Sequence, residues 1–298
     1  MSDGASLQAR LLIMAIRMLR VKRTFAPDRL ETTIAENRRK GPAQPVFTRR
    51  LKAISTTWGG RTIHTVAPRG WTGGRRLLYL HGGGFVLSIQ DPHWGFIGKL
   101  AERLDAAVTV PLYPLAPEHS LEVMHAWLLG FYRALDDQGA LTLVGDSAGA
   151  TLALTLAMQA RDLGLPQPER LVLLSPALDF SFSDPAQPAI DRVDPILNLA
   201  GMANLLATFA PGLDPHDPVV SPLFGDLTGL APMALFAGGL DLTYPDAARF
   251  QSRLAAQGSN LALFDYPAMP HVWPLFPLPE AEQALDETVA FIENRPNA

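Results

Sequence analysis

Residues 141–150 read Leu-Thr-Leu-Val-Gly-Asp-Ser-Ala-Gly-Ala, a short apolar run that leads through a G-x-S-x-G motif into a helical pattern. Gly145 and Gly149 leave room for a sharp turn from strand to helix, which holds Ser147 in a strained conformation with its hydroxyl exposed. The following helix directs its N-terminal amides at the same point. The stretch therefore predicts a buried strand, a tight turn and a nucleophilic serine.

A second glycine motif supports this interpretation. Residues 77–85 read Leu-Leu-Tyr-Leu-His-Gly-Gly-Gly-Phe, so three glycines follow another short apolar run. Consecutive glycines lose much conformational entropy on folding and are best explained by close approach of the backbone to a ligand. We expect the backbone amides of Gly82 and Gly83, with that of Ala148, to form an oxyanion hole. Both motifs in this order arise in roughly 0.0003 of random chains of this composition, so chance is a poor explanation.

A serine nucleophile needs a base whose pKa is near neutrality, and the motif order places that histidine last. His271 is the last histidine of the chain and follows the apolar run 261–266. The acid that orients it is expected after the preceding strand, where Asp241 follows the apolar run 233–237 and two glycines. Asp246 is the rival, but a carboxylate directly after a proline is typical of the first turn of a helix.

The rest of the chain alternates apolar runs with helical patterns. Continuous apolar runs suit strands buried on both faces of a parallel sheet, so the layout predicts an α/β fold. Strands are expected at 51–56, 61–66, 77–80, 106–110, 141–144, 171–174, 233–237 and 261–266, and helices at 6–22, 96–104, 121–135, 148–163, 247–257 and 280–293.

Two stretches fall outside this alternation. Residues 23–45 are a Pro- and Arg-containing stretch in which periodicity predicts no element. Residues 179–231 separate two strands by more than a plain crossover needs, so they are expected to form an inserted functional element with a helix at 196–209.

Composition excludes several classes of protein. The chain of 298 residues is 48% hydrophobic and can bury a sizeable core. It has no cysteine, which excludes disulfides, thiolate catalysis and cysteine-ligated metals. The net charge of −4 gives no electrostatic case for nucleic acid. His93, His119 and His125 lack the spacing of metal ligands, so no metal site is expected.

The charge is unevenly distributed along the chain. Residues 1–50 hold 11 Lys/Arg against 4 Asp/Glu, whereas the remainder holds 14 against 25. A basic arm docked on an acidic body is the simpler interpretation, and contact of the apolar, basic helix at 6–22 with an anionic membrane is the alternative. The apolar run 11–16 is too short for an export signal and no stretch is long enough to span a bilayer. A cytoplasmic protein without stable membrane insertion is therefore expected.

Taken together, these motifs resemble those of the hormone-sensitive-lipase-like esterases of the α/β-hydrolase fold. The matching segments, in the family's order, are 81–85, 113–118, 145–149, 221–223, 239–241 and 270–271. The resemblance implies an eight-stranded, mostly parallel sheet flanked by helices and covered by a helical cap. It further implies N-terminal cap helices in residues 1–45 and a catalytic domain in residues 46–298, with the cap insertion within 179–231.

The same resemblance implies hydrolysis of short- to medium-chain acyl esters by Ser147, His271 and Asp241, through an acyl-enzyme and without a cofactor. A small-molecule ester is the expected partner, and homodimerisation through the edge of the last strand is plausible for the family. A non-catalytic small-ligand receptor on the same scaffold is one alternative, although the presence of His271 argues against it. An amidase, lactonase or thioesterase is another, because the three residues alone do not define the bond that is cleaved.

Around the site, the sequence departs from the family's pattern at Pro114, where Arg is usual, and at Ser88, where Gly is usual. Both positions are expected near the pocket wall and leave acyl and alcohol preference open. Asp146 and Glu118 are expected to organise the site by hydrogen bonding. The acyl pocket is expected to involve Phe85, Leu87, Leu199, Met202 and Leu206. Ordinary core packing is the alternative role of these apolar side chains.

Overall fold

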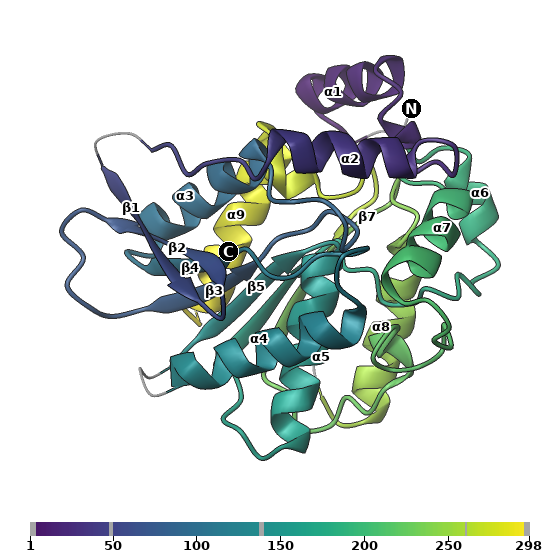
Figure 1. Cartoon of the computed structure of the whole chain (residues 1–298). Helices are drawn as coiled ribbons and strands as arrows, with labels where there is room; N and C mark the ends of the chain where they lie inside the picture. The colour runs from purple at the N-terminus through teal and green to yellow at the C-terminus, as the bar shows by residue number, and fades with distance from the viewer. Residues whose placement is uncertain (1–3, 48–49, 137–139, 260, 295–298) are drawn as a thin grey trace.

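An eight-stranded sheet forms the centre of the computed structural model, which describes residues 4–47, 50–136, 140–259 and 261–294 (Figure 1). The strand order is β1-β2-β4-β3-β5-β6-β7-β8. The pairs β1–β2 and β2–β4 are antiparallel and the remaining pairs are parallel, so the predicted mostly parallel sheet is confirmed. The strands are β1 (Leu51–Trp58), β2 (Arg61–Pro68), β3 (Arg76–Leu80), β4 (Ala107–Pro111), β5 (Thr142–Asp146), β6 (Arg170–Leu174), β7 (Met233–Gly238) and β8 (Leu261–Tyr266).

Helices cover both faces of the sheet, which explains why the central strands are apolar without interruption. Leu77 and Tyr79 of β3 pack into a core with α3 and α9, while Leu78 and Leu80 pack on the other face with α4 and α5. Successive side chains of a strand point to opposite faces, so each must be apolar when both faces are covered. The covering helices are α3 (Asp91–Arg103), α9 (Pro279–Ile292), α4 (Leu121–Asp136), α5 (Ala148–Asp162) and α8 (Tyr244–Ala256).

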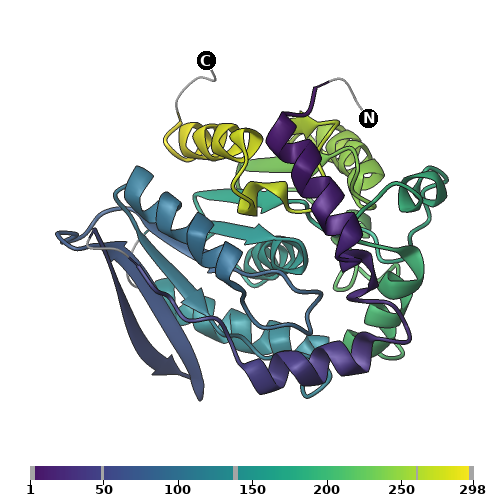
Figure 2. The same ribbon diagram turned by 90° about the horizontal axis from the view of Figure 1, so that it is seen from above.

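Residues 179–231, which connect β6 to β7, are called the insertion below. The insertion and the segment before the sheet lie next to each other beside the sheet (Figures 1 and 2). Asn198 of the insertion donates a hydrogen bond from Nδ2 to the carbonyl oxygen of Lys22 at 2.8 Å. The Lys22 ammonium also pairs with Asp191. The elements of these two segments are α1 (Leu7–Met18), η1 (Val21–Arg23), α2 (Leu30–Lys40), α6 (Gln187–Asp191), α7 (Leu199–Phe209) and η2 (Pro222–Phe224). A last short turn, η3 (Trp273–Leu275), follows β8.

Several helices differ from the predicted bounds; α3, for example, begins at Asp91 rather than at residue 96. Periodicity gives no signal in residues 23–45, yet α2 forms there and buries Leu30 and Ile34. Its apolar residues are too few to give a periodic signal, although the family resemblance implied more than one helix. The first helix ends at Met18 rather than at residue 22, because Arg20 has the left-handed φ of 54°.

Two further expectations concern a homodimer contact at the edge of the sheet and helices that could cross a membrane. β8 forms one edge of the sheet, at which the predicted homodimer contact would lie, and that contact stays a prediction. Within the described residues, no helix combines the length and the apolar character that crossing a membrane requires.

Candidate active site

Ser147 occupies the turn between β5 and α5, with φ 51° and ψ −124°. A positive φ is uncommon for a residue with a Cβ atom and persists only where the surroundings enforce it. The flanking glycines do so: a Cβ on Gly145 would lie 2.5 Å from the carbonyl oxygen of Gly149. A Cβ on Gly149 would lie 2.0 Å from the carbonyl oxygen of Leu80. Only glycine at both positions lets helix α5 begin directly against the sheet and hold the serine in this turn.

The structure brings together the three residues predicted to react. The Ser147 hydroxyl oxygen lies 2.8 Å from Nε2 of His271, and Nδ1 of His271 lies 2.7 Å from Oδ2 of Asp241. The other carboxylate oxygen of Asp241 accepts the backbone N–H of Thr243 at 2.9 Å. Since a carboxylate can only accept, Nδ1 carries the proton and Nε2 is free to accept one from the serine. Asp241 follows β7 and His271 follows β8, so adjacent parallel strands deliver both side chains to one edge of the sheet.

The electrostatic surroundings favour the protonated form of His271. Burial lowers the pKa of the imidazole, but the Asp241 carboxylate and its hydrogen bond, and then Asp194 and Asp146, raise it above its usual value. Stabilisation of the imidazolium is what a base needs while it holds a proton taken from a serine.

Asp194, which the sequence did not single out, comes from the insertion and lies beside Asp241. Its Oδ1 accepts the amides of Ile196 and Leu197 at 2.6 and 2.9 Å, and its Oδ2 accepts the amide of Leu242 at 2.7 Å. Burial, and then the charge of Asp241, raise the pKa of Asp194 to about 6. The insertion thereby places a second carboxyl group beside the acid and base.

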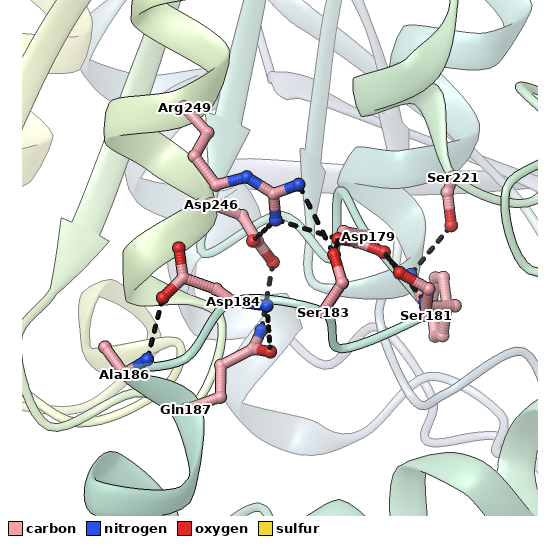
Figure 3. Close-up of polar contacts among 10 residues, drawn as sticks. Asp179, Ser181, Ser183, Asp184, Ala186, Gln187, Ser221, Asp246 and Arg249 are labelled. Carbon is pink, nitrogen blue, oxygen red and sulfur yellow. Dashed lines mark hydrogen bonds and ion pairs between the residues drawn. The ribbon is translucent and has the colours of Figure 1, made fainter.

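Asp246, the rival for the acid, belongs to a different cluster, which Figure 3 shows in close-up. One guanidinium nitrogen of Arg249 lies 2.8 Å from both Asp246 Oδ1 and Asp179 Oδ2, and Gln187 donates to Asp246 at 3.4 Å. Among the described residues, no hydrogen bond joins Asp246 to His271. Burial, and then the charge of Asp179, raise the pKa of Asp246 to about 7. This cluster ties the start of the insertion to α8.

The structure corrects one of the three predicted oxyanion donors. The backbone N–H of Gly82 donates to Oδ1 of Asp146 at 3.0 Å and is therefore engaged. Gly83, Gly84 and Ala148 line the cavity beside the serine, and their amides have no acceptor within the part of the chain that the structure describes. Gly83 and Ala148, two of the predicted donors, thus line the cavity together with Gly84, which the sequence did not single out.

Asp146 joins several polar groups beside Ser147 by hydrogen bonding, as the sequence predicts. Besides the Gly82 amide, it accepts the hydroxyl of Tyr79 at 2.7 Å and lies 3.3 Å from Nε2 of His93. Burial disfavours the charged form of both groups. The Asp146 carboxylate nevertheless raises the pKa of His93, and His93 lowers the pKa of Asp146, so each favours the charged form of the other. The Gly82 hydrogen bond therefore attaches the three glycines to the residue before Ser147, and the buried pair with His93 attaches α3 to the same carboxylate, a role that the sequence position of His93 did not reveal.

Arg38 of α2 binds the glycine loop, residues 82–86, at its C-terminal end. Its guanidinium donates to the carbonyl oxygens of Val86 and Ala116 at 2.7 and 2.8 Å. It also forms two hydrogen bonds with the Glu118 carboxylate, both at 2.9 Å. The hydrogen bonds from Arg38 lower the pKa of Glu118. In this chain the arginine that meets Glu118 thus comes from an N-terminal helix, while Pro114 stands where the family usually has an arginine.

A cavity of about 250 Å³ opens beside Ser147. Leu87 and Met202 line it, as predicted, but Phe85, Leu199 and Leu206 lie outside its lining. The centre of the Phe85 ring lies 4.2 Å from the centre of the Phe209 ring. Leu199 and Leu206 pack against the core. Apolar residues that the sequence did not indicate complete the wall, among them Phe25, Phe180, Ile196, Leu197, Leu205 and Phe276.

Known proteins share both the sequence pattern and the fold. A family model described as alpha/beta hydrolase fold matches residues 77–275. An acetyl-hydrolase of Streptomyces hygroscopicus is 32% identical over 74% of this chain and 75% of that protein. An esterase of Acinetobacter venetianus is 31% identical over 72% of this chain and 73% of that protein. The solved structure of an esterase from the bacterial hormone-sensitive lipase family superposes with a TM-score of 0.84 at 27% identity, covering 99% of both chains.

The chain therefore belongs to the α/β-hydrolase family. Within that family it is a hormone-sensitive-lipase-like esterase, as the motifs of the sequence predict, and thus an enzyme of the serine carboxylesterase type.

Proposed function

We propose that this chain hydrolyses carboxylic esters with short to medium acyl chains, using Ser147 as nucleophile, His271 as base and Asp241 as orienting acid. The observation that carries the proposal is the unbroken chain of hydrogen bonds from Asp241 through His271 to the serine hydroxyl, which ends at an apolar cavity. A nucleophile, a base and an orienting group within hydrogen-bond reach define this mechanism by geometry.

In the first half-reaction, the Ser147 oxygen attacks the ester carbonyl carbon while Nε2 of His271 takes the hydroxyl proton. The carbonyl oxygen becomes an oxyanion, and the amides of Gly83, Gly84 and Ala148 are the donors that face it. One such donor typically contributes about 3–4 kcal/mol to transition-state stabilisation. Collapse of the intermediate breaks the bond to the alcohol oxygen, which leaves with the proton held by His271. Water then attacks the acyl-enzyme by the same route and releases the acid.

The size of the cavity supports small acyl groups. At about 250 Å³ it is smaller than the roughly 300–1,000 Å³ typical of pockets for drug-sized ligands. Its apolar wall includes Leu205, which lies so close to Gly84 that a Cβ there would be 2.9 Å from a Leu205 methyl carbon. The Streptomyces hygroscopicus relative is named an acetyl-hydrolase, which agrees with a small acyl group.

The test is hydrolysis of p-nitrophenyl acetate, butyrate, octanoate and palmitate by the wild type, by Ser147→Ala and by Ser252→Ala. Ser252 is an exposed serine on α8 and serves as the matched control. We expect the highest kcat/KM on acetate or butyrate, loss of turnover in Ser147→Ala, and unchanged turnover in the control. Highest activity on palmitate would indicate a lipase instead. Turnover only of the matching amide, lactone or thioester would reassign the reaction, and binding without turnover of any of them would indicate a receptor.

A further inference from the structure

Helix α1 has two apolar faces, of which the fold uses only one. Its inner face buries Ala9, Ile13 and Ile16 against the rest of the molecule. Its outer face carries four large apolar side chains at intervals of four, three and four residues, which is the spacing of a single helical stripe. Their exposed fractions are 70% for Leu7, 55% for Leu11, 52% for Met14 and 71% for Met18.

This outer stripe is the main concentration of exposed apolar surface in the part of the chain that the structure describes. Ten large apolar residues are exposed there, and the stripe with the adjacent Leu19 accounts for five of them. Isolated exposed apolar residues are normal on a protein surface, but a contiguous patch marks a site of interaction.

Basic side chains border the stripe. Arg10 and Arg17 lie on one flank of α1 and Arg20 follows its C-terminus, all three exposed. Arg10 and Arg17 donate to the backbone carbonyls of Ala5 and Val193, and neither forms an ion pair with a carboxylate among the described residues. Residues 4–27 contain no Asp or Glu. An apolar groove of about 400 Å³ runs along the same flank, with both arginines in its lining.

We propose that the outer face of α1 docks on an anionic lipid surface, with the apolar stripe in the boundary between headgroups and acyl chains and the three arginines on lipid phosphates. An amphipathic helix that lies in the plane of the interface needs this combination of an apolar face and bordering cations. The remainder of the chain beyond residue 50 is acidic, with 14 Lys/Arg against 25 Asp/Glu, so electrostatic attraction selects this face over the others.

A second copy of the chain is the less favourable occupant. Two α1 stripes packed against each other around a two-fold axis would bring Arg10, Arg17 and Arg20 of both copies together. The segment offers no carboxylate to neutralise them, and like charges brought together across an interface disfavour association.

Docking through α1 would also orient the active site. The chain passes from α1 through η1 to Phe25, which lines the cavity beside Ser147. At the other end of the helix, the backbone N–H of Ser6 donates to Glu280 of α9 at 2.6 Å and anchors α1 to the body of the molecule. The docked helix is thus continuous with a segment of the cavity wall, so docking would place the cavity near the phase in which lipid esters are concentrated. Lipid docking goes beyond the proposed function and does not depend on it, because lipid binding can be measured without turnover.

The experiment is co-sedimentation of the full chain with vesicles of phosphatidylglycerol and phosphatidylcholine, compared with vesicles of phosphatidylcholine alone. We expect binding to the anionic vesicles that weakens as salt is added, because salt screens the arginine–phosphate attraction. The triple variant Leu11→Gln, Met14→Gln, Met18→Gln and the double variant Arg10→Gln, Arg17→Gln are each expected to bind at least tenfold more weakly. These side chains are exposed, so the substitutions leave the core intact.

Two controls separate docking through α1 from a general effect of surface apolar residues and from the esterase reaction. Val123→Gln combined with Leu163→Gln removes exposed apolar residues outside α1 and is expected to bind like the wild type. Ser147→Ala is expected to bind vesicles fully while losing turnover, so failure of the esterase proposal leaves the docking result readable. Absence of binding to anionic vesicles, or equal binding by the α1 variants, would overturn the proposal. So would sedimentation equilibrium that shows a dimer dissociated by the triple variant without any vesicle binding, because the occupant would then be a second copy.

Discussion

Asp241→Asn tests the acid of the proposed mechanism with the smallest change of shape. The carboxylate makes two hydrogen bonds, one to Nδ1 of His271 at 2.7 Å and one from the Thr243 amide at 2.9 Å. An asparagine keeps its carbonyl oxygen on the Thr243 N–H, because two donors cannot face each other. Its NH2 group then points at Nδ1 of His271, which must become an acceptor.

The consequence is a change of tautomer at the base. With Nδ1 accepting, the imidazole proton moves to Nε2, and Nε2 no longer accepts the proton of Ser147. The variant also lacks the negative charge that stabilises the imidazolium. In serine enzymes with this arrangement the same change lowers kcat by about four orders of magnitude, or about 5 kcal/mol of transition-state stabilisation.

The assay is p-nitrophenyl butyrate hydrolysis, with thermal unfolding to show that the variant is folded. Asp246→Asn is the matched control, because Asp246 is equally buried but contacts Arg249 and Gln187 instead of the base. We expect its kcat to stay within a few-fold of the wild type. An Asp241→Asn variant with activity within tenfold of the wild type would refute the reasoning, and loss of activity only in Asp246→Asn would reassign the acid.

Four further changes probe the surroundings of the site. Asp194→Asn removes a charge that raises the pKa of the base, so the acidic limb of the kcat/KM–pH profile should move to lower pH, whereas a purely structural role would leave its midpoint unchanged. Arg38→Ala frees the glycine loop and should lower kcat/KM about tenfold or more, with partial rescue by Arg38→Lys, which keeps the charge but not the planar fork. Leu205→Ala enlarges the cavity, and burial of two further methylenes of octanoate at about 0.8 kcal/mol each should raise the octanoate-to-butyrate ratio of kcat/KM by about tenfold, while an unchanged ratio would place the acyl chain elsewhere. Gly149→Ala places a Cβ 2.0 Å from a carbonyl oxygen and should lower Tm by roughly 5–10 °C, unlike Gly95→Ala, whose Cβ meets nothing within 4 Å.

The sequence could predict the sheet because its strands are buried on both faces. Burial on both faces requires uninterrupted apolar runs, and such runs are visible without any knowledge of contacts. The position of the serine turn was predictable for a related reason. At Gly145 and Gly149 a Cβ would collide with backbone, so the motif records the geometry directly.

Other features depend on contacts that no local pattern records. Helix α2 has too few apolar residues for a periodic signal and is fixed by what Leu30 and Ile34 pack against. Which glycine amide faces the cavity depends on Asp146, whose hydrogen bond turns the Gly82 N–H away from it. Asp194 reaches the acid from a distant insertion, and no spacing within the motifs could reveal that approach.

The same limit applies to the cavity wall. Phe85 follows the three glycines in sequence, yet its ring is directed into the core against Phe209. Phe25, which lies far from every motif, lines the cavity instead. The direction of a side chain at a loop depends on tertiary packing, so proximity in sequence to a motif was a weak guide.

Covalent labelling by diethyl p-nitrophenyl phosphate, followed by intact mass and peptide mapping, tests the central claim most directly. This ester phosphorylates an activated serine and releases p-nitrophenol, so label and product can be counted together. The proposed mechanism predicts one label per chain, located on Ser147, with activity on p-nitrophenyl butyrate lost in proportion and no label in Ser147→Ala. Full esterase activity with Ser147 unlabelled, or a stoichiometric label on another residue that accounts for the lost activity, would contradict it.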